Sequence, residues 1–350
     1  MKKYCVVEKG LLEQHAGSKA RCDAAQILIK EGWEAVYVNP IKVRTNVSYL
    51  ERLRVIPGFL RDWKKICSRT EKGDSLLIQY PLDMYPKVAM LGLKYIRKMK
   101  EKGVRIRLLI HDIDSLRTGD PADRAWYQDA EKSFFELADD IIAHNEKMIA
   151  YLRSIGLTQP ITSLELFDYL IEGEIKEEEE LREDVVIAGN LSREKAGYLY
   201  SLKESQVHFS LFGPNLDQKG TGKNCSYQGS FQPDKLPEVL KGKFGLVWDG
   251  AYADRCGGEF GEYMRYNNPH KTSLYLACGI PVIVWEEAAV SAFVKKHGVG
   301  ITVGSLEELP ERLESMTEKD YRTMKENTIQ VGNRLRRGSM LKTAINRTGV

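Results

Sequence analysis

Residues 266–285 read YNNPHKTSLYLACGIPVIVW and are the most informative stretch of this sequence. A polar turn precedes a helix start, and a Gly-Ile-Pro turn one helix later leads into an apolar strand. The turn contains Asn267, Asn268, Pro269, His270, Lys271 and Thr272. Asn268 can cap the helix, and the proline after it suits the first helical position. Because a helix N-terminus has unpaired N–H groups and the positive end of a dipole, the turn predicts a diphosphate site in an α/β domain.

Composition and length predict a soluble globular protein with two domains. The chain has 350 residues, of which 43% are hydrophobic and 29% charged. No apolar run approaches the roughly 20 residues of a membrane helix, and Glu8 and Lys9 interrupt the apolar N-terminal stretch, which therefore predicts a strand and not a secretory signal. Six cysteines without a CxxC pair indicate free thiols in the cytoplasm. A net charge of +3 is too small to predict nucleic-acid binding.

Strands and helices alternate along the chain. In the first half we expect strands at 4–8, 35–39, 75–80, 106–111 and 140–144, and helices at 19–30, 49–69, 87–102 and 124–138. After a charged run at 172–184, strands are expected at 185–188, 207–212, 244–248, 280–285 and 300–303, and a last helix at 318–337. Short buried strands that alternate with helices predict parallel sheets covered on both faces.

The alternation predicts an organisation in four parts. They are an N-terminal α/β domain at 1–165, a linker at 166–184, a second α/β domain at 185–317, and a C-terminal helix and tail at 318–350. We expect the tail to pack back toward the first domain. Two α/β domains joined by a polar linker form a cleft, which is the usual place for a small-molecule site.

The segment HDIDSLR, residues 111–117, directly follows a predicted strand. Asp112 and Asp114 form a DxD triplet beside His111, and in some transferases such a triplet holds a divalent metal. At a strand end, a carboxylate here also suits the removal of a proton from an acceptor hydroxyl. The alternative is an Asx-type turn that only caps the next segment.

Two other turns follow predicted strands. Gly17 and Ser18 come after the first strand, where a glycine permits close approach of a ligand and a serine can cap a helix. Taken alone, this turn favours the alternative of an ordinary helix cap without a ligand. The turn lacks GxGxxG, so nicotinamide binding is not predicted. AGNLSREK, residues 188–195, opens the second half, and either Arg193 or Lys195 can reach a phosphate.

Two further features lie in the second half. Tyr227 follows a loop whose GTGKN run does not fit the phosphate-binding loop of nucleotide triphosphatases. Its ring either stacks on a base or packs on its own domain. VWDG, residues 247–250, ends a predicted strand with an acid at the same edge as the proposed phosphate turn.

YNNPHKTSLYLACGIPVIV resembles the donor-site signature of GT-B glycosyltransferases, in which a Pro-His-Lys turn, a helix and an A-x-G-x-P-V-I strand hold a nucleotide diphosphate. With HDIDSLR and AGNLSREK, the whole chain is similar to the bacterial glucosyltransferase and β-1,6-galactofuranosyltransferase family. That family includes enzymes that add glucose to GlcNAc on serine-rich-repeat adhesins. The resemblance implies an α/β protein of the GT-B fold, with two Rossmann-like domains whose parallel sheets face a cleft.

The resemblance also implies site residues. The expected donor contacts are Gly17, Ser18, Arg193, Tyr227, Asn267, Asn268, Pro269, His270, Lys271 and Thr272. These enzymes need no metal, so we expect no metal and no cofactor beyond the UDP-sugar substrate, and we assign His111, Asp112 and Asp114 to the acceptor side. Many retaining members have an E-x7-E pair. Here Glu262 is followed eight positions later by His270, so the retaining mechanism is not transferred.

We therefore predict a cytoplasmic enzyme that moves glucose or galactofuranose from a UDP-sugar to a GlcNAc-bearing or related glycan or glycoprotein. Lys271, Arg193 and the helix start would neutralise the departing UDP. Expected partners are the UDP-sugar, the acceptor, a second copy of the chain, and a membrane surface or a partner glycosyltransferase, but no nucleic acid. The alternative is a non-catalytic sugar-nucleotide-binding partner of another transferase, and the acids of HDIDSLR argue against it. The sequence lacks the motifs of an epimerase or dehydrogenase.

Overall fold

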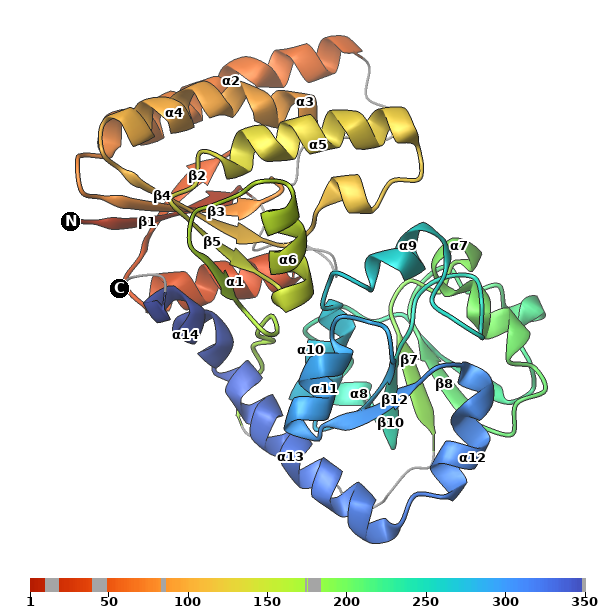
Figure 1. The fold of residues 1–350 in the computed structure, drawn as a ribbon. Helices are drawn as coiled ribbons and strands as arrows, with labels where there is room; N and C mark the ends of the chain where they lie inside the picture. The colour runs from red at the N-terminus through yellow and green to blue at the C-terminus, as the bar shows by residue number, and fades with distance from the viewer. Residues whose placement is uncertain (10–18, 40–48, 83–85, 174, 176–183, 348–350) are drawn as a thin grey trace. The chain divides into compact units, whose positions relative to one another are not determined.

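The computed structural model describes residues 1–9, 19–39, 49–82, 86–173, 175 and 184–347 (Figure 1). Contacts divide the chain into two compact units, and each is described by itself. The first unit contains Met1–His144, Met148–Leu164 and the chain from Leu341, and the second unit contains Asn145–Lys147 and Glu165–Met340. Among the described helices, none combines the length and the apolar character that crossing a bilayer requires.

The first unit is built on a parallel sheet of six strands in the order β2-β1-β3-β4-β5-β6. The strands are β1 Lys3–Glu8, β2 Glu34–Val38, β3 Ser75–Tyr80, β4 Arg105–Ile110, β5 Asp140–Ala143 and β6 Ile161–Ser163. Five of these were predicted to within a few residues. The short edge strand β6 was not predicted, because its residues are only half-buried and form no apolar run.

Helices cover both faces of this sheet. The helices and turns are α1 Lys19–Lys30, α2 Tyr49–Arg69, α3 Pro86–Ala89, η3 Met90–Gly92, α4 Leu93–Glu101, η4 Asp114–Leu116, α5 Pro121–Phe135, α6 Glu146–Ser154 and α14 Ser339–Arg347. The core on one face joins alternate strand residues to α2, α4 and α5. On the other face Arg107 donates to Asp140 at 2.9 Å and to the backbone oxygen of Ile345 in α14 at 3.2 Å. The predicted helix at 87–102 is divided into α3, η3 and α4, and its break contains Gly92.

The second unit contains a second parallel sheet of six strands, in the order β12-β11-β10-β7-β8-β9. The strands are β7 Val185–Ala188, β8 Phe209–Phe212, β9 Cys225–Gly229, β10 Phe244–Val247, β11 Val282–Trp285 and β12 Gly300–Val303. This is the strand order of the classic Rossmann fold, in which the direction of winding changes between the first and fourth strands, here β7 and β10. The edge strand β9 was predicted only as a loop exit, since CSYQG has no apolar run.

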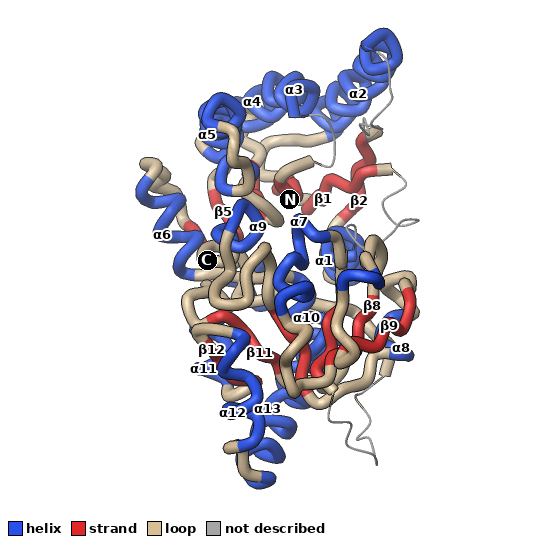
Figure 2. The backbone as a smooth tube through the Cα atoms, turned by 90° about the vertical axis from the view of Figure 1, so that its right-hand side faces the viewer, coloured by secondary structure: helices blue, strands red, loops and turns tan. Residues whose placement is uncertain are grey.

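Two helices of the second unit approach each other closely at a glycine, Gly332. The helices and turns are α7 Arg193–Ala196, η5 Gly197–Ser201, η6 Gln218–Gly220, α8 Leu236–Val239, α9 Gly258–Tyr263, α10 His270–Ala277, α11 Ser291–His297, η7 Leu306–Glu308, α12 Leu309–Glu314 and α13 Glu318–Arg336. A Cβ atom on Gly332 of α13 would lie 2.1 Å from the backbone oxygen of Leu276 in α10. Only glycine therefore permits this approach of α13 to α10. Figure 2 shows the helices and strands of the chain from a second side.

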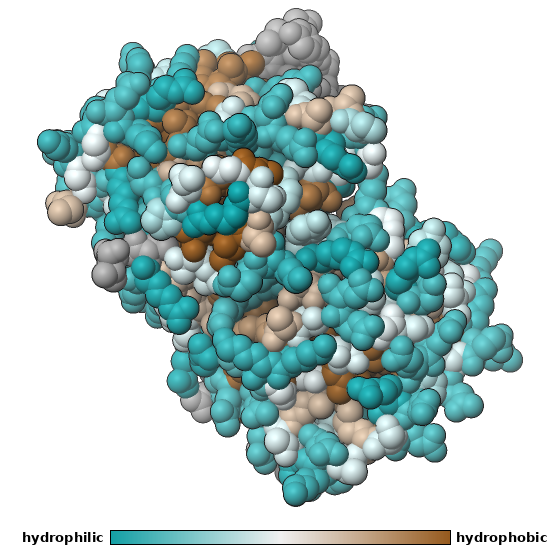
Figure 3. All heavy atoms as spheres, in the orientation of Figure 1, coloured by the Kyte–Doolittle hydropathy of each residue, from teal (hydrophilic) through white to brown (hydrophobic). Residues whose placement is uncertain are grey.

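Hydrophilic side chains dominate the face drawn in Figure 3. The largest exposed apolar side chains, among them Tyr37 and Tyr252, come from separate elements of the chain. Isolated apolar side chains of this kind are normal on a protein surface.

Candidate active site

In the second unit, the segments after β7 and β10 are joined at the point where the winding of the sheet changes. The Gly250 N–H donates to the Lys195 oxygen at 2.8 Å, and the Tyr198 N–H donates to the Gly250 oxygen at 3.2 Å. Gly250 has φ +113°, and a Cβ atom there would lie 2.2 Å from the Gly257 oxygen, so the turn requires glycine. Open α/β sheets bind ligands at this edge.

Lys271 of α10 extends to this edge. Its Nζ donates to the Trp248 oxygen at 2.9 Å and to Asp249 Oδ1 at 2.7 Å. Because an ammonium group has three N–H donors, these two contacts orient Lys271 and leave one donor for an anion. Asp249 lies two residues after the end of β10, and the sequence predicts an acid at this edge. Its pairing with Lys271 was not predicted.

The residue at the N-cap position of α10 differs from the one that the sequence predicts. Pro269 occupies the N-cap position, and its side chain makes no capping hydrogen bond to the first turn. The Asn268 Oδ1 instead accepts a hydrogen bond from Asn145 Nδ2 at 2.7 Å, and its amide donates to the Glu165 oxygen. The expectation that Asn268 caps the helix is therefore wrong, because its side chain holds the turn to two earlier segments. The Thr272 N–H of the first turn already donates to the Pro269 oxygen at 2.9 Å, and the positive end of the helix dipole favours an anion beside this turn.

Two buried polar atoms beside this turn lack partners. Asn267 Oδ1 and Thr272 Oγ1 make no hydrogen bond within the described residues, and Thr272 is fully buried. Unpaired buried polar atoms are rare in native structures and cost free energy, so they favour a ligand at this position. His270, between them, stacks on the ring of Tyr169 with a centroid distance of 5.0 Å.

The remaining donor-side residues have partners within the second unit. Arg193 is 60% exposed and donates to Asp217 Oδ2 at 2.6 Å, while its guanidinium lies 4.0 Å from the centroid of the Tyr200 ring. Lys195 lies near the ring of Phe260, 5.3 Å from its centroid. The choice between Arg193 and Lys195 as the phosphate contact stays open.

Three residues complete the set of expected donor contacts. Tyr227 is half exposed on β9, and its hydroxyl donates to the Gly213 oxygen at 3.0 Å. Gly17 and Ser18 lie outside the described residues.

In the first unit, HDIDSLR follows β4 and contains the turn η4. His111 Nε2 lies 2.7 Å from Gln79 Oε1. Arg117 lies 2.9 Å from Asp112 and 3.9 Å from Asp114, so the two carboxylates share one guanidinium. Neither caps η4, whose N-cap is Ile113 without a side-chain hydrogen bond.

Burial raises the pKa of Asp114 above its ordinary value, although Arg117 opposes this effect. A carboxylate with a raised pKa accepts a proton more readily than an ordinary one. The raised pKa is the property that makes Asp114 a candidate proton acceptor.

Two buried titratable residues of the first unit were missed. Glu131 of α5 is 0% exposed and accepts hydrogen bonds from Ser115, and His144 follows β5 with its pKa lowered to about 4 by burial. The sequence contained one signal for Glu131. It stands three and four positions before Phe134 and Phe135, and therefore on the apolar face of α5.

Models of two domains of one protein family match nearly the whole chain. "Glucosyltransferase 3-like, N-terminal domain" matches residues 4–166, and "Glucosyltransferase 3-like, C-terminal domain" matches residues 185–348. The chain belongs to the Glucosyltransferase 3-like family. The predicted family and the prediction of a glycosyltransferase enzyme are confirmed.

Two curated relatives agree with this membership. The β-1,6-galactofuranosyltransferase WbbI of Escherichia coli (strain K12) is 37% identical over 245 residues, which are 69% of this chain and 70% of WbbI. Glucosyltransferase 3 of Streptococcus gordonii is 28% identical over 255 residues, 72% of either chain.

Solved structures confirm the predicted GT-B fold for this Glucosyltransferase 3-like protein. Sucrose-phosphate synthase from Thermosynechococcus elongatus aligns with a TM-score of 0.69 and 12% identity over 99% of this chain and 98% of its own. An α-glucosyltransferase (AGT) in complex with UDP aligns with a TM-score of 0.57 and 13% identity over 100% and 99%. At such identities the likeness concerns the fold alone.

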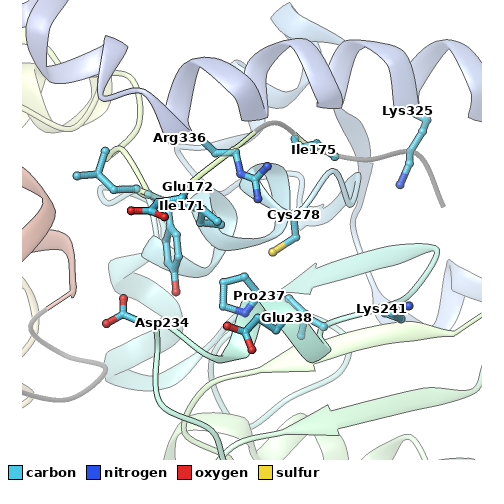
Figure 4. A pocket seen from close by; sticks show the side chains of 13 residues that line it. Ile171, Glu172, Ile175, Asp234, Pro237, Glu238, Lys241, Cys278, Lys325 and Arg336 are labelled. Atoms are coloured by element: carbon cyan, nitrogen blue, oxygen red, sulfur yellow. The ribbon is translucent and has the colours of Figure 1, made fainter.

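The second unit of this Glucosyltransferase 3-like protein also has a cavity of about 940 Å³ that contains none of the predicted site residues. It lies between α8, α13, the end of α10 and the chain near Tyr169, and in Figure 4 the guanidinium of Arg336 points toward Cys278. Acidic and basic side chains line it together, so its charge selects no class of ligand. The edge with Lys271 and Asp249 therefore stays the candidate donor site.

We expect the free energy of unfolding of this Glucosyltransferase 3-like protein to depend on pH through Glu131. Burial, opposed by the bonds from Ser115 and reinforced by Asp114, raises its pKa from 4.5 to about 7. Between these values the folded state holds a proton that the unfolded state releases, so the free energy of unfolding falls as the pH rises. At about 1.4 kcal/mol per pKa unit, the loss is about 3 kcal/mol between pH 4.5 and pH 7.

A glutamine at position 131 cannot ionise. The free energy of unfolding of Glu131→Gln should therefore not show this loss as the pH rises. Denaturant unfolding at pH 5 and pH 8 measures the difference between wild type and variant at each pH. We expect the variant to gain about 3 kcal/mol relative to wild type between the two. Asp129→Asn, an exposed change on the same helix, is the control and should show no such gain. If the free energies of unfolding of wild type and Glu131→Gln differed by the same amount at both pH values, the raised pKa of Glu131 would be contradicted.

Proposed function

We propose that this protein transfers a hexose, glucose or galactofuranose, from a UDP-sugar to a hydroxyl of a glycan or glycoprotein acceptor, one that bears GlcNAc or a related sugar. The observation that supports the donor is the Lys271 ammonium, oriented by Trp248 and Asp249 beside the uncapped start of α10. A diphosphate accepts N–H bonds from such a helix start and from a lysine. The names of the curated relatives support a hexose as the group that is transferred.

The chemistry assigned to the donor side is stabilisation of the leaving group. The bond between the anomeric carbon and the β-phosphate oxygen breaks, and UDP departs with an additional negative charge. Lys271 and the positive end of the α10 dipole offset that charge, together with either Arg193 or Lys195. Fixed donors of this kind need no reorganisation while the bond breaks, which is why they lower the barrier.

The chemistry assigned to the acceptor side is removal of a proton. The acceptor oxygen bonds to the anomeric carbon and its proton passes to Asp114, or to Asp112 beside it. Asp114 suits this role because its pKa lies above the ordinary value while Arg117 holds it in place. His111, fixed by Gln79, is proposed as a neighbouring acceptor contact.

The proposal extends to other properties of the chain. We assign acceptor binding to residues 1–165, donor binding to residues 185–317, and packing toward the first domain to the tail at 318–350. Tyr227 and the turn of Gly17 and Ser18 are proposed as further UDP contacts. A cytoplasmic location, self-association, contact with a membrane surface or partner transferase, and independence of metal ions stay predictions.

Binding and turnover test the proposed function directly. UDP and UDP-hexoses should raise the thermal unfolding temperature, and GDP and ADP should raise it less, because ligands that bind the folded state stabilise it. UDP-glucose and UDP-galactofuranose are then incubated with GlcNAc-bearing acceptors, with and without EDTA, and released UDP is measured. We expect release that depends on the acceptor and persists in EDTA. Binding without turnover across the acceptor panel would favour the non-catalytic partner instead.

A further inference from the structure

A carboxylate buried inside the first unit holds the turn that carries the proposed base. Glu131 Oε1 accepts the Ser115 N–H at 2.9 Å, and its Oε2 accepts the Ser115 hydroxyl at 2.5 Å. Ser115 is itself 1% exposed and is the middle residue of η4, directly after Asp114. Both oxygens of one buried side chain are thus used to fix a single turn.

No lysine or arginine forms an ion pair with Glu131 within the described part of the chain. The groups near it are Ser115 and Asp114 of η4, Tyr80 of β3, and Tyr151 of α6, whose hydroxyl lies 3.2 Å from the Ser115 hydroxyl. A buried carboxylate without a cation costs folding free energy, and an apolar residue of similar volume avoids that cost. We therefore explain this folding cost of the buried Glu131 carboxylate by the turn η4, which the carboxylate fixes.

We propose that Glu131 is a positioning residue for the transfer reaction, and that it acts by fixing η4 so that Asp114 stands at the acceptor hydroxyl. This inference rests on the proposed function and adds a residue to it. Glu131 touches neither substrate. Its effect reaches the reaction only through the position of the turn, in which Arg117 also pairs with both aspartates.

The variant Glu131→Gln tests this role because it keeps the volume and removes one acceptor. Its single carbonyl oxygen can accept the Ser115 N–H, but its amide nitrogen cannot accept the Ser115 hydroxyl. At pH 8, where the Glu131 carboxyl is ionised, we expect kcat to fall about 10-fold to 100-fold, the loss that a small misplacement of a reacting group produces. The KM for the UDP-sugar and the affinity for UDP should stay unchanged, since those contacts belong to the second unit.

Three controls separate positioning from loss of folded protein. The thermal unfolding temperature and the stoichiometry of UDP binding give the fraction of folded enzyme, by which kcat is corrected. Asp129→Asn removes an exposed carboxylate from the same helix and should leave kcat unchanged. A corrected kcat within twofold of wild type for Glu131→Gln would overturn the inference, even though wild-type turnover upheld the proposed function.

A double-variant comparison identifies the residue through which Glu131 acts. In an Asp112→Asn, Asp114→Asn background, Glu131→Gln should cause no further loss, because the group that it positions is already inactive. A loss of the same size as in wild type would overturn the inference. Wild-type turnover of the aspartate background itself would overturn the proposed base, and the inference with it.

Discussion

Replacing Lys271 by methionine is expected to lower kcat/KM about 100-fold to 1000-fold, the range found when one preorganised donor to a developing charge is removed. Methionine keeps most of the length of the side chain but lacks the ammonium that Trp248 and Asp249 orient. UDP release at saturating acceptor measures the effect. The loss should appear in kcat as well as in KM, because the charge on UDP grows as the bond breaks.

Loss of folding needs to be excluded, because Lys271→Met leaves the buried Asp249 without its cation. The double variant Lys271→Met, Asp249→Asn removes that unpaired charge, so it should recover thermal stability and stay inactive. Lys295→Met changes an exposed lysine of α11 and should match wild type. Turnover close to wild type in Lys271→Met would contradict the assignment of this edge to the diphosphate.

The second large effect is expected from the aspartates of HDIDSLR. If Asp114 is the base, Asp114→Asn lowers kcat about 100-fold to 10,000-fold, the usual contribution of a positioned general base. Asp112→Asn is expected to cost much less, since Arg117 still holds Asp114. The transfer rate at saturating donor measures both variants, and unchanged rates in both would place the base elsewhere.

The pH dependence of transfer provides an independent check on Asp114. A base is inactive when protonated, and burial raises the pKa of Asp114, so the wild-type rate should begin to fall at a pH above that of an ordinary aspartate. This acid limb should be missing from the residual activity of Asp114→Asn. If the acid limb of the pH profile persisted unchanged in Asp114→Asn, the limb would have to arise from the titration of another group.

The regular elements were the part that the sequence predicted well. Apolar strands such as Ser75–Tyr80 and Val185–Ala188 are buried runs between polar turns, and local composition is sufficient to locate them. The edge strands Ile161–Ser163 and Cys225–Gly229 were not predicted as strands. Their residues are half-buried or exposed, and only pairing with a neighbour far along the chain makes them strands.

The donor turn was predicted from its residue types, but its contacts were not. Lys271 was expected to face a phosphate, whereas its pairing with Asp249 depends on the order of strands in the sheet. Asn268 has the residue type of a helix cap, and local reasoning assigned it that role. Its actual partners lie 123 and 103 positions earlier in the chain, a distance over which a sequence pattern carries no information.

The hydrogen bonds of Asn268 also limit which segments of two related transferases can be recombined to exchange their donor sites. One partner, Asn145, comes from the end of the first half of the chain, and the other, Glu165, precedes the charged run. A segment that starts at Val185 would carry Lys271 and the whole second sheet, yet it would lack both of these partners of the Asn268 side chain. Recombination that moves donor preference from one transferase to another therefore has to transfer these two early residues as well, so inheritance of the donor site does not follow the boundary between the two sheets.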